Sequence, residues 1–206
     1  MVDFTQRHLY LCVSLRNDMS TFLPAVLGAG VDVVQLREKN APEDDQLRAG
    51  REMKKMCADF GVPFIMNDSP TLALAVDADG VHVGQDDISV AECRELLGSD
   101  AVVGISTHAS DEFTASLPLP VTYRSAGPIV PTPTKPGREA TGIDYAVWAT
   151  QHSPDPVFVT GGVDSTNIAS LIDAGLRHFV VVRSLTQSSN PAAEARAMRD
   201  IINSRL

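Results

Sequence analysis

The sequence is poor in positive charge, and lysine in particular is scarce. Its 206 residues contain 17 Lys and Arg against 26 Asp and Glu, which leaves a formal net charge of −9. Surfaces that bind nucleic acid or anionic membranes need clustered Lys and Arg. The composition therefore argues against both kinds of partner. It leaves room for an anionic small molecule, because a few well-placed cations can hold a phosphate locally.

Long apolar runs are also absent. No run approaches the roughly 18–20 residues that cross a bilayer, so we expect no transmembrane segment. The chain begins MVDFTQRHLYLCV, and its early acid and short apolar stretch are not typical of a secretory signal. The cysteines, Cys12, Cys57 and Cys93, form no C-x-x-C pair. This spacing favours buried thiols in a reducing cytoplasm over disulfides or a zinc site.

What the sequence does have is a regular alternation of short β-like runs and helical patterns. The runs are rich in Val and Ile, and several lack polar alternation, which is typical of strands in a buried parallel sheet. The runs are His8–Ser14, Val31–Leu36, Pro63–Met66, Gly80–Val83, Ala101–Ser106, Val121–Ser125, Val157–Thr160 and Phe179–Val182.

Helix start and stop signals lie between these runs. Ser89 and Glu92 fit a capping box, in which each side chain bonds the backbone of the other residue. Asp164 or Ser165 is expected to cap a helix that runs through Ala174. A last helix is expected to begin near position 191 and to continue to the C-terminus.

Eight strand–helix units fit a (β/α)₈ TIM barrel, which we expect residues 1–206 to form as a single domain. The chain provides about 26 residues per unit, near the small end for this fold. A doubly wound open sheet is the alternative. One long connection, residues 127–142, contains prolines at positions 128, 131, 133 and 136. Connections of this length in a compact domain are usually functional or disordered.

In such a barrel the carboxyl ends of the strands form the functional face. Asp68 and Asp87 follow neighbouring strands, which lie about 4.8 Å apart. Two carboxylates so placed can share one Mg²⁺ with waters and substrate phosphates. Other strand ends and the long connection carry groups suited to anions, namely Gln35, Arg37, Lys39, Asn67, Ser106, Thr132, Thr134, Lys135, Gly162 and Arg183.

Each of these residues also has an ordinary structural interpretation. Residues 37–39 can be a solvated loop, residues 67–70 a turn with a helix cap, and residues 161–162 a tight turn. What favours a site is the combination, because two of the four lysines in the chain, Lys39 and Lys135, fall at predicted strand ends.

Two histidines lie near the same face. His82 is expected to point into the barrel wall as a satisfied core group. His108 lies close to Ser106 in the sequence, but no Ser-His-Asp set with assignable geometry is visible. The sequence therefore indicates anion and metal binding rather than nucleophilic catalysis.

Taken together, these segments resemble the thiamine phosphate synthase family. The similarity covers nearly the whole chain, and the segments occur in the same order. They are QLREK at 35–39, ND at 67–68, ADGVHVGQDD at 78–87, GIS at 104–106, GPIVPTPTK at 127–135 and GGV at 161–163. Each segment alone is only moderately specific, and the resemblance rests on their combined order.

The resemblance implies a cytoplasmic transferase of thiamine biosynthesis with two small-molecule substrates. The family joins a hydroxymethylpyrimidine diphosphate to a thiazole phosphate. Diphosphate leaves, a pyrimidine-stabilised cation forms, and the thiazole nitrogen attacks it. By this resemblance, the pyrimidine diphosphate is bound by Gln35, Arg37, Lys39 and Asn67, and Mg²⁺ is bound by Asp68 and Asp87. Catalytic contacts to the diphosphate come from Ser106 and Lys135. The thiazole phosphate is bound by Thr132, Thr134, Gly162 and Val182.

The chain departs from the family at one position. Where the family commonly has a small residue after the last strand, this chain has Arg183, followed by Ser184. The guanidinium can form a bidentate contact with the thiazole phosphate. Its alternative is to fold away and pair with a surface acid.

Two other functions stay open at this stage. One is a thiazole tautomerase-like relative on the same barrel, and the other is a non-catalytic sensor of a phosphorylated ligand. The set of Lys39, Asp68, Asp87 and Lys135 favours the synthase, because neither alternative needs a metal site for a diphosphate. The sequence leaves a homo-oligomer open.

Overall fold

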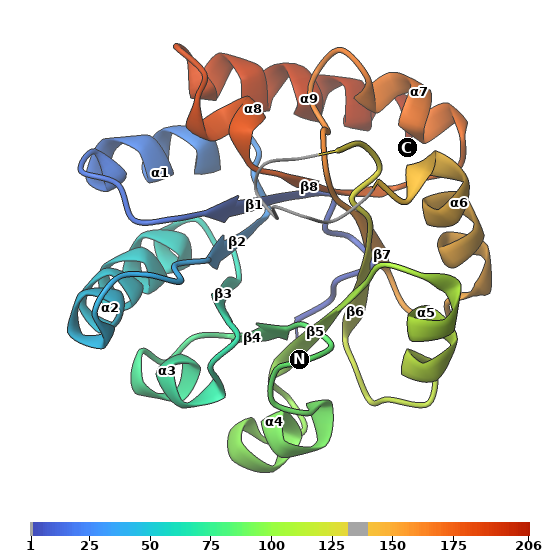
Figure 1. Cartoon of the computed structure of the whole chain (residues 1–206). Helices are drawn as coiled ribbons and strands as arrows, with labels where there is room; N and C mark the ends of the chain where they lie inside the picture. The colour runs from blue at the N-terminus through green and yellow to red at the C-terminus, as the bar shows by residue number, and fades with distance from the viewer. Residues whose placement is uncertain (1, 132–139) are drawn as a thin grey trace.

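Eight parallel strands pair in chain order and close into a barrel (Figure 1). The strands are β1 (Leu9–Val13), β2 (Val33–Leu36), β3 (Phe64–Asn67), β4 (Gly80–Val83), β5 (Val102–Thr107), β6 (Tyr123–Ala126), β7 (Val157–Val159) and β8 (His178–Val181). Leu9 of β1 lies opposite Phe179 of β8, and this pairing closes the ring. The predicted (β/α)₈ barrel is confirmed, and the open sheet was wrong.

The helices surround the ring of strands (Figure 1). They are α1 (Met19–Leu27), α2 (Glu43–Asp59), α3 (Pro70–Ala75), α4 (Val90–Leu97), α5 (Ser110–Ser116), α6 (Gly142–His152), α7 (Ile168–Asp173), α8 (Arg183–Thr186) and α9 (Pro191–Arg205). The structure, a computed structural model, describes residues 2–131 and 140–206. Within these ranges no helix is both long enough and apolar enough to span a membrane.

The capping signals were partly correct. The Ser89–Glu92 box is present at the start of α4, where Ser89 Oγ accepts from the Glu92 N–H at 3.2 Å. The start predicted for α7 was wrong, because that helix begins only at Ile168. Asp164 instead accepts from the N–H of Thr166 at 2.8 Å, so its carboxylate stabilises a turn before the helix.

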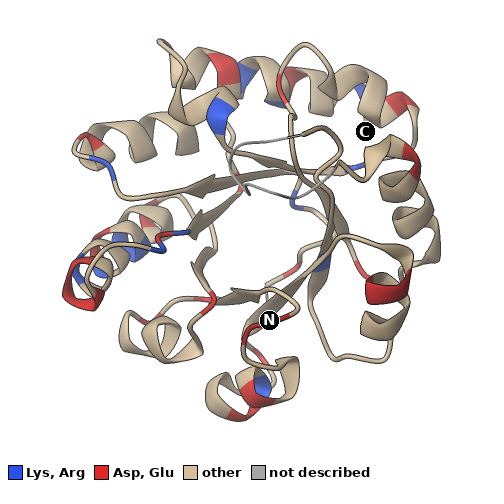
Figure 2. Cartoon of the chain, in the orientation of Figure 1, with Lys and Arg blue, Asp and Glu red and all other residues tan. Residues whose placement is uncertain are grey.

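The strands carry almost no charge, and the ribbons of the barrel wall are correspondingly tan in Figure 2. Alternate residues face inward and outward. The outward residues pack against the helices. Inward ones join Phe4, which precedes β1, in a second apolar cluster inside the barrel, with Tyr10, Val33, Ile65, Val102, Tyr123 and Phe158. The ring of Phe4 stacks on Tyr123 with centroids 4.9 Å apart, so the N-terminal segment helps to fill the barrel interior.

Arg124 of β6 is the charged exception among the strand residues, and it is fully buried. Its guanidinium pairs with Asp155 and donates to Ser116 Oγ at 2.9 Å and to the Ser116 carbonyl at 2.7 Å. Buried charges persist in proteins when they are paired and hydrogen-bonded in this way. The group ties the end of α5 to β6 and to the segment that enters β7.

Candidate active site

A cavity of about 610 Å³ opens at the carboxyl ends of the strands. Its wall includes eight of the predicted site residues, Gln35, Arg37, Lys39, Asn67, Asp68, Asp87, Ser106 and Val182. Tyr10 and Tyr123 also line it, although nothing in their sequence context indicated a site. Both side chains face into the barrel. The signal in the sequence that could have found them is that a buried phenol needs a hydrogen-bond partner.

A second cavity, of about 470 Å³, adjoins the first. Thr160, Val180 and Val182 line both, so the two cavities share a wall. The second cavity contains Gly162, Val182 and Arg183, which the sequence predicted as phosphate-binding positions. Three further predicted residues, Thr132, Thr134 and Lys135, lie outside the described residues.

The second cavity also contains a polar group that the sequence analysis did not assign. Ser184 Oγ is buried and, among the described residues, has no hydrogen-bond partner. Leaving a buried hydroxyl unsatisfied is unfavourable, so this atom points to a polar ligand. The neighbouring Arg183 is exposed, and no acid within residues 2–131 and 140–206 forms an ion pair with it.

The ends of β3 and β4 place two carboxylates together. Asp68 has a left-handed backbone with φ of 62°, a conformation that Asp tolerates better than most residues. Asp87 accepts a hydrogen bond from the Gly84 N–H at 2.8 Å, and its carboxyl group is close enough to Asp68 for each to shift the pKa of the other. Lys39 Nζ lies 2.9 Å from Asp68 Oδ2, which brings a cation to the pair.

The two carboxyl groups have opposite pKa shifts. Partial burial raises the pKa of Asp68, and the nearby Asp87 raises it further, although Lys39 opposes both effects. Burial alone would raise the pKa of Asp87 as well, but the Gly84 N–H and the Asp68 carboxyl group outweigh it and lower the pKa. Asp87 is therefore the more acidic member of the pair, and Asp68 holds its proton more readily.

This donor set fits a divalent cation such as Mg²⁺. Mg²⁺ typically takes one or two carboxylates and completes its shell with waters and substrate phosphates. Among the described residues, no group of three or more His, Cys, Asp or Glu side chains is placed to hold a metal. A cation on Asp68 and Asp87 would therefore depend on water and substrate for its remaining ligands.

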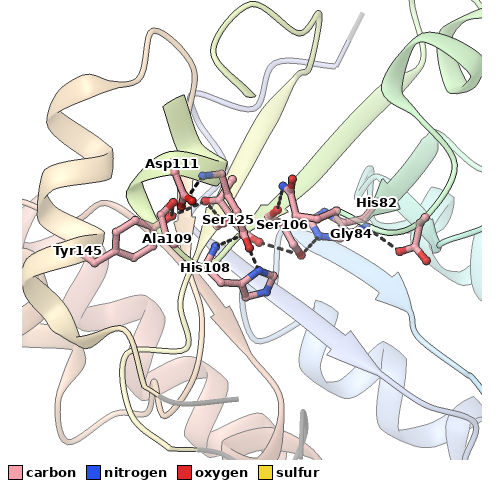
Figure 3. A network of polar contacts seen from close by, with 12 residues as sticks. His82, Gly84, Ser106, His108, Ala109, Asp111, Ser125 and Tyr145 are labelled. Carbon is pink, nitrogen blue, oxygen red and sulfur yellow. Dashed lines mark hydrogen bonds and ion pairs between the residues drawn. The ribbon is translucent and has the colours of Figure 1, made fainter. Parts of the chain in front are cut away.

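Ser106 at the end of β5 is hydrogen-bonded to His82, as the close view in Figure 3 shows. His82 Nε2 lies 2.9 Å from Ser106 Oγ, and His82 Nδ1 lies 2.9 Å from the Tyr123 hydroxyl. His108, by contrast, pairs with Glu112 at 3.0 Å. The prediction that His82 is a buried, satisfied group is confirmed, and it additionally lines the cavity.

No Ser-His-Asp triad is formed by the described residues around Ser106. The histidine nitrogen that would need a carboxylate faces a phenol instead. Ser106 is therefore suited to donating a hydrogen bond to a ligand, and its surroundings do not activate it as a nucleophile.

Solved structures with the same architecture come from several enzymes. A thiamine phosphate pyrophosphorylase from Pyrococcus furiosus superposes with a TM-score of 0.88 at 22% identity, over 97% of this chain and 96% of that one. A 3-hexulose-6-phosphate synthase superposes with a TM-score of 0.73 at 18% identity, over 95% and 99% of the two chains. At these identities the likeness concerns the fold alone.

Sequence comparison is more specific. The pattern of the family described as thiamine monophosphate synthase matches residues 9–185. A thiamine-phosphate synthase of Acidothermus cellulolyticus is 43% identical over 192 residues, which cover 91% of each chain. One from Nostoc punctiforme is 42% identical over 89% of this chain, but this chain spans only 52% of that relative's length. On these matches, the chain belongs to the thiamine monophosphate synthase family of transferases.

Proposed function

We propose that this chain is a thiamine-phosphate synthase. It would couple 4-amino-2-methyl-5-hydroxymethylpyrimidine diphosphate with 4-methyl-5-(2-phosphooxyethyl)thiazole. The C–O bond between the pyrimidine methylene and the diphosphate breaks, and diphosphate leaves with the electron pair. A C–N bond to the thiazole nitrogen then forms and gives thiamine phosphate.

One structural observation supports this proposal beyond family membership. Two cavities share a wall at the carboxyl rim of one barrel. The first contains Arg37, Lys39 and the paired carboxylates, a set suited to a diphosphate with its cation. The second contains Arg183 and the unsatisfied Ser184, a set suited to a single phosphate. Two phosphorylated substrates can therefore meet at the shared wall.

The residues of the first cavity take the roles that a departing diphosphate requires. Negative charge grows on this group in the transition state, so donors and cations fixed in advance stabilise it most. Lys39, Lys135 and Ser106 are assigned to these contacts, and Gln35 and Asn67 to the polar edge of the substrate. When bound at Asp68 and Asp87, Mg²⁺ would neutralise charge on the leaving group.

The second cavity holds the thiazole phosphate in this proposal. Gly162 and Val182 provide backbone groups, and Arg183 provides the positive charge. Ser184 adds a hydroxyl whose hydrogen-bond capacity is unused among the described residues. Thr132 and Thr134, which lie outside the described residues, are assigned to the same phosphate.

An assay of the purified full chain tests the proposed activity. Both substrates are supplied with Mg²⁺ or with a chelator, and thiamine phosphate and diphosphate are measured. We expect equal amounts of both products, and only when the metal is present. A tautomerase-like protein or a sensor would bind the thiazole phosphate and release neither product. If the chain binds both substrates but releases neither thiamine phosphate nor diphosphate, the proposal is overturned.

A cytoplasmic enzyme with small-molecule substrates is part of the same proposal. Cys12, Cys57 and Cys93 are buried thiols, which suits a reducing compartment. Single-domain organisation over residues 1–206 and assembly into a homo-oligomer stay predictions. Light scattering on the purified chain would measure the oligomeric state.

A further inference from the structure

A chain of hydrogen bonds crosses the interior of the barrel. Gln35 Nε2 donates to the Tyr10 hydroxyl at 2.7 Å, and the Tyr10 and Tyr123 hydroxyls lie 2.9 Å apart. The Tyr123 hydroxyl lies 2.9 Å from His82 Nδ1, and His82 Nε2 lies 2.9 Å from Ser106 Oγ. All five side chains are buried. We call Gln35, Tyr10, Tyr123 and His82 the relay, and Ser106 its end.

The relay depends on a glycine in the strand between two of its members. Gly104 of β5 lies opposite His82 on one side and opposite Tyr123 on the other. A Cβ atom at this position would lie 2.2 Å from Tyr123 Cζ and 2.6 Å from His82 Nδ1. Both distances are far inside van der Waals contact. Because Gly104 has no side chain, the Tyr123 hydroxyl and the His82 ring can form their hydrogen bond across β5.

The orientation of the Gln35 amide favours one direction of donation along the relay, from Gln35 toward Ser106. Gln35 turns its amide nitrogen toward Tyr10, while its Oε1 lies 3.4 Å from the Cys12 thiol. A phenol has a single hydrogen to donate. With Gln35 donating to Tyr10, the direction that satisfies every member has Tyr10 donating to Tyr123 and Tyr123 donating to His82 Nδ1. The ring proton of His82 then resides on Nε2 and faces Ser106.

The opposite direction gives the amide of Gln35 poorer partners. It would require Tyr10 to donate to Oε1 and the amide NH₂ to face the sulfur of Cys12. Sulfur is a weak acceptor, whereas a phenol oxygen is a good one. Burial also raises the pKa of Tyr10 and of Tyr123 well above the ordinary value, so both phenols keep the hydrogens that the relay needs.

We propose that the relay fixes His82 in its Nε2–H tautomer and thereby makes Ser106 a dedicated hydrogen-bond donor to the ligand in the cavity. Ser106 Oγ accepts from His82 and, at 3.4 Å, from Ser125 Oγ. Its two lone pairs are then occupied, and its own hydrogen is directed to the ligand. Gln35, Tyr10, Tyr123 and His82 act in this respect as positioning residues. The tautomer is independent of the proposed function, and only the identity of the acceptor, a diphosphate oxygen, rests on it.

Nitrogen NMR of the His82 ring in the full, ligand-free chain tests the tautomer directly. The measurement is made at mildly alkaline pH, where imidazole is neutral. We expect the wild-type proton on Nε2 and a mixture of tautomers in Tyr123→Phe, because Nδ1 then loses its donor. Tyr145→Phe is the matched control, since it removes a phenol hydrogen-bonded at 2.8 Å to Thr107, outside the relay. A proton on Nδ1 in the wild type, or an unchanged tautomer in Tyr123→Phe, would overturn the proposal.

A double-mutant cycle tests whether the relay acts through Ser106. Tyr123→Phe is expected to lower kcat by about tenfold, the size of one lost hydrogen bond. In a Ser106→Ala background the same change should have no further effect, because the group that the relay positions is gone. If Tyr123→Phe lowers kcat about tenfold in the Ser106→Ala background as well, Tyr123 has a merely structural role and the proposal is overturned. A wild type that makes no product while the tautomer holds would contradict the proposed function alone.

Discussion

Lys39 lies at the rim of the barrel, between an ion-pair partner and the first cavity. It pairs with Asp68, and it lines the cavity that we assign to the pyrimidine diphosphate. Half of its side chain is exposed, and ion pairs of this kind contribute about 0–1 kcal/mol to stability. Lys39 can therefore exchange Asp68 for a phosphate at little cost when the substrate and its cation arrive.

Substitution of the two carboxylates tests the proposed requirement for Mg²⁺. Asp68→Ala and Asp87→Ala should each lose turnover, with partial recovery at high Mg²⁺, because one ligand of a two-carboxylate site is removed. Turnover is measured against the Mg²⁺ concentration. Asp59→Ala, which removes an exposed acid at the end of α2, is the control. Both site variants keeping wild-type turnover after chelation would show that the metal site is elsewhere.

Lys135 is expected to act mainly in the transition state, because charge on the diphosphate grows as it leaves. By comparison with loss of one preorganised donor, Lys135→Ala should cost about 3 kcal/mol, mostly in kcat. Steady-state kinetics measure kcat and KM separately, and Lys55→Ala, at an exposed lysine, is the control. An effect confined to KM would indicate equal binding of substrate and transition state and would refute this role.

Arg183 is expected to bind the thiazole phosphate. It is exposed, lines the second cavity and has no carboxylate partner among the described residues. Arg183→Ala should raise KM for the thiazole phosphate roughly tenfold, from the loss of a charged hydrogen bond of about 1.5–3 kcal/mol. KM for the pyrimidine diphosphate should stay nearly unchanged. If neither constant changes, the phosphate is held by backbone groups and Ser184 instead.

At the scale of helices and strands, Arg124 joins three elements. It links β6 to the end of α5 through Ser116 and to the entrance of β7 through Asp155. The guanidinium is fully buried, whereas Asp155 retains partial exposure. A buried charge that loses its partner is expensive, because the desolvation cost stays while the attraction is lost.

Removing the charge of Asp155, the ion-pair partner of Arg124, should therefore make the protein less stable. Asp155→Asn is expected to lower the free energy of unfolding by about 3 kcal/mol, the low end for a broken buried pair, because water reaches Asp155. Asp173→Asn, at the exposed Asp173–Arg205 pair, should cost less than about 1 kcal/mol. Urea denaturation of both variants measures the difference, and equal losses would contradict the argument.

At the scale of the whole molecule, the partly buried carboxyl group of Asp68 opposes stability. The folded state raises the pKa of Asp68, so folding disfavours the charged form of that group. The penalty is absent at acid pH, where the carboxyl is protonated in both states, and it develops as the pH rises above the ordinary value of 3.8. Functional sites commonly trade stability for activity in this way.

Asp68→Asn should accordingly stabilise the metal-free protein while it abolishes turnover. Asparagine tolerates the left-handed backbone at this position, so the change adds no strain. Thermal unfolding of both proteins in chelator should show a higher midpoint for the variant at neutral pH, and the gap should close toward acid pH. A lower midpoint at neutral pH would mean that the Lys39–Asp68 pair outweighs the repulsion.

The sequence by itself determined the architecture and most of the rim. Short runs rich in Val and Ile, several without polar alternation, are typical of strands buried on both faces, and all eight strands were located to within about two residues. The strand ends then identified Lys39, Asp68 and Asp87, because parallel strands bring their carboxyl ends to one face. The start of α7 was missed because an Asp before a helix can equally stabilise the turn that precedes it.

Only the tertiary structure decided the interior of the site. Tyr10 and Tyr123 are 113 residues apart and share a hydrogen bond because closure of the barrel brings β1 and β6 to face each other. Ser106 is only two residues from His108 in the sequence but is bonded to His82, because the neighbouring strand β4 supplies an inward histidine, whereas His108 lies beyond the end of β5 and pairs with Glu112. Periodicity reports which face a residue occupies, whereas its partner depends on the register and closure of all eight strands.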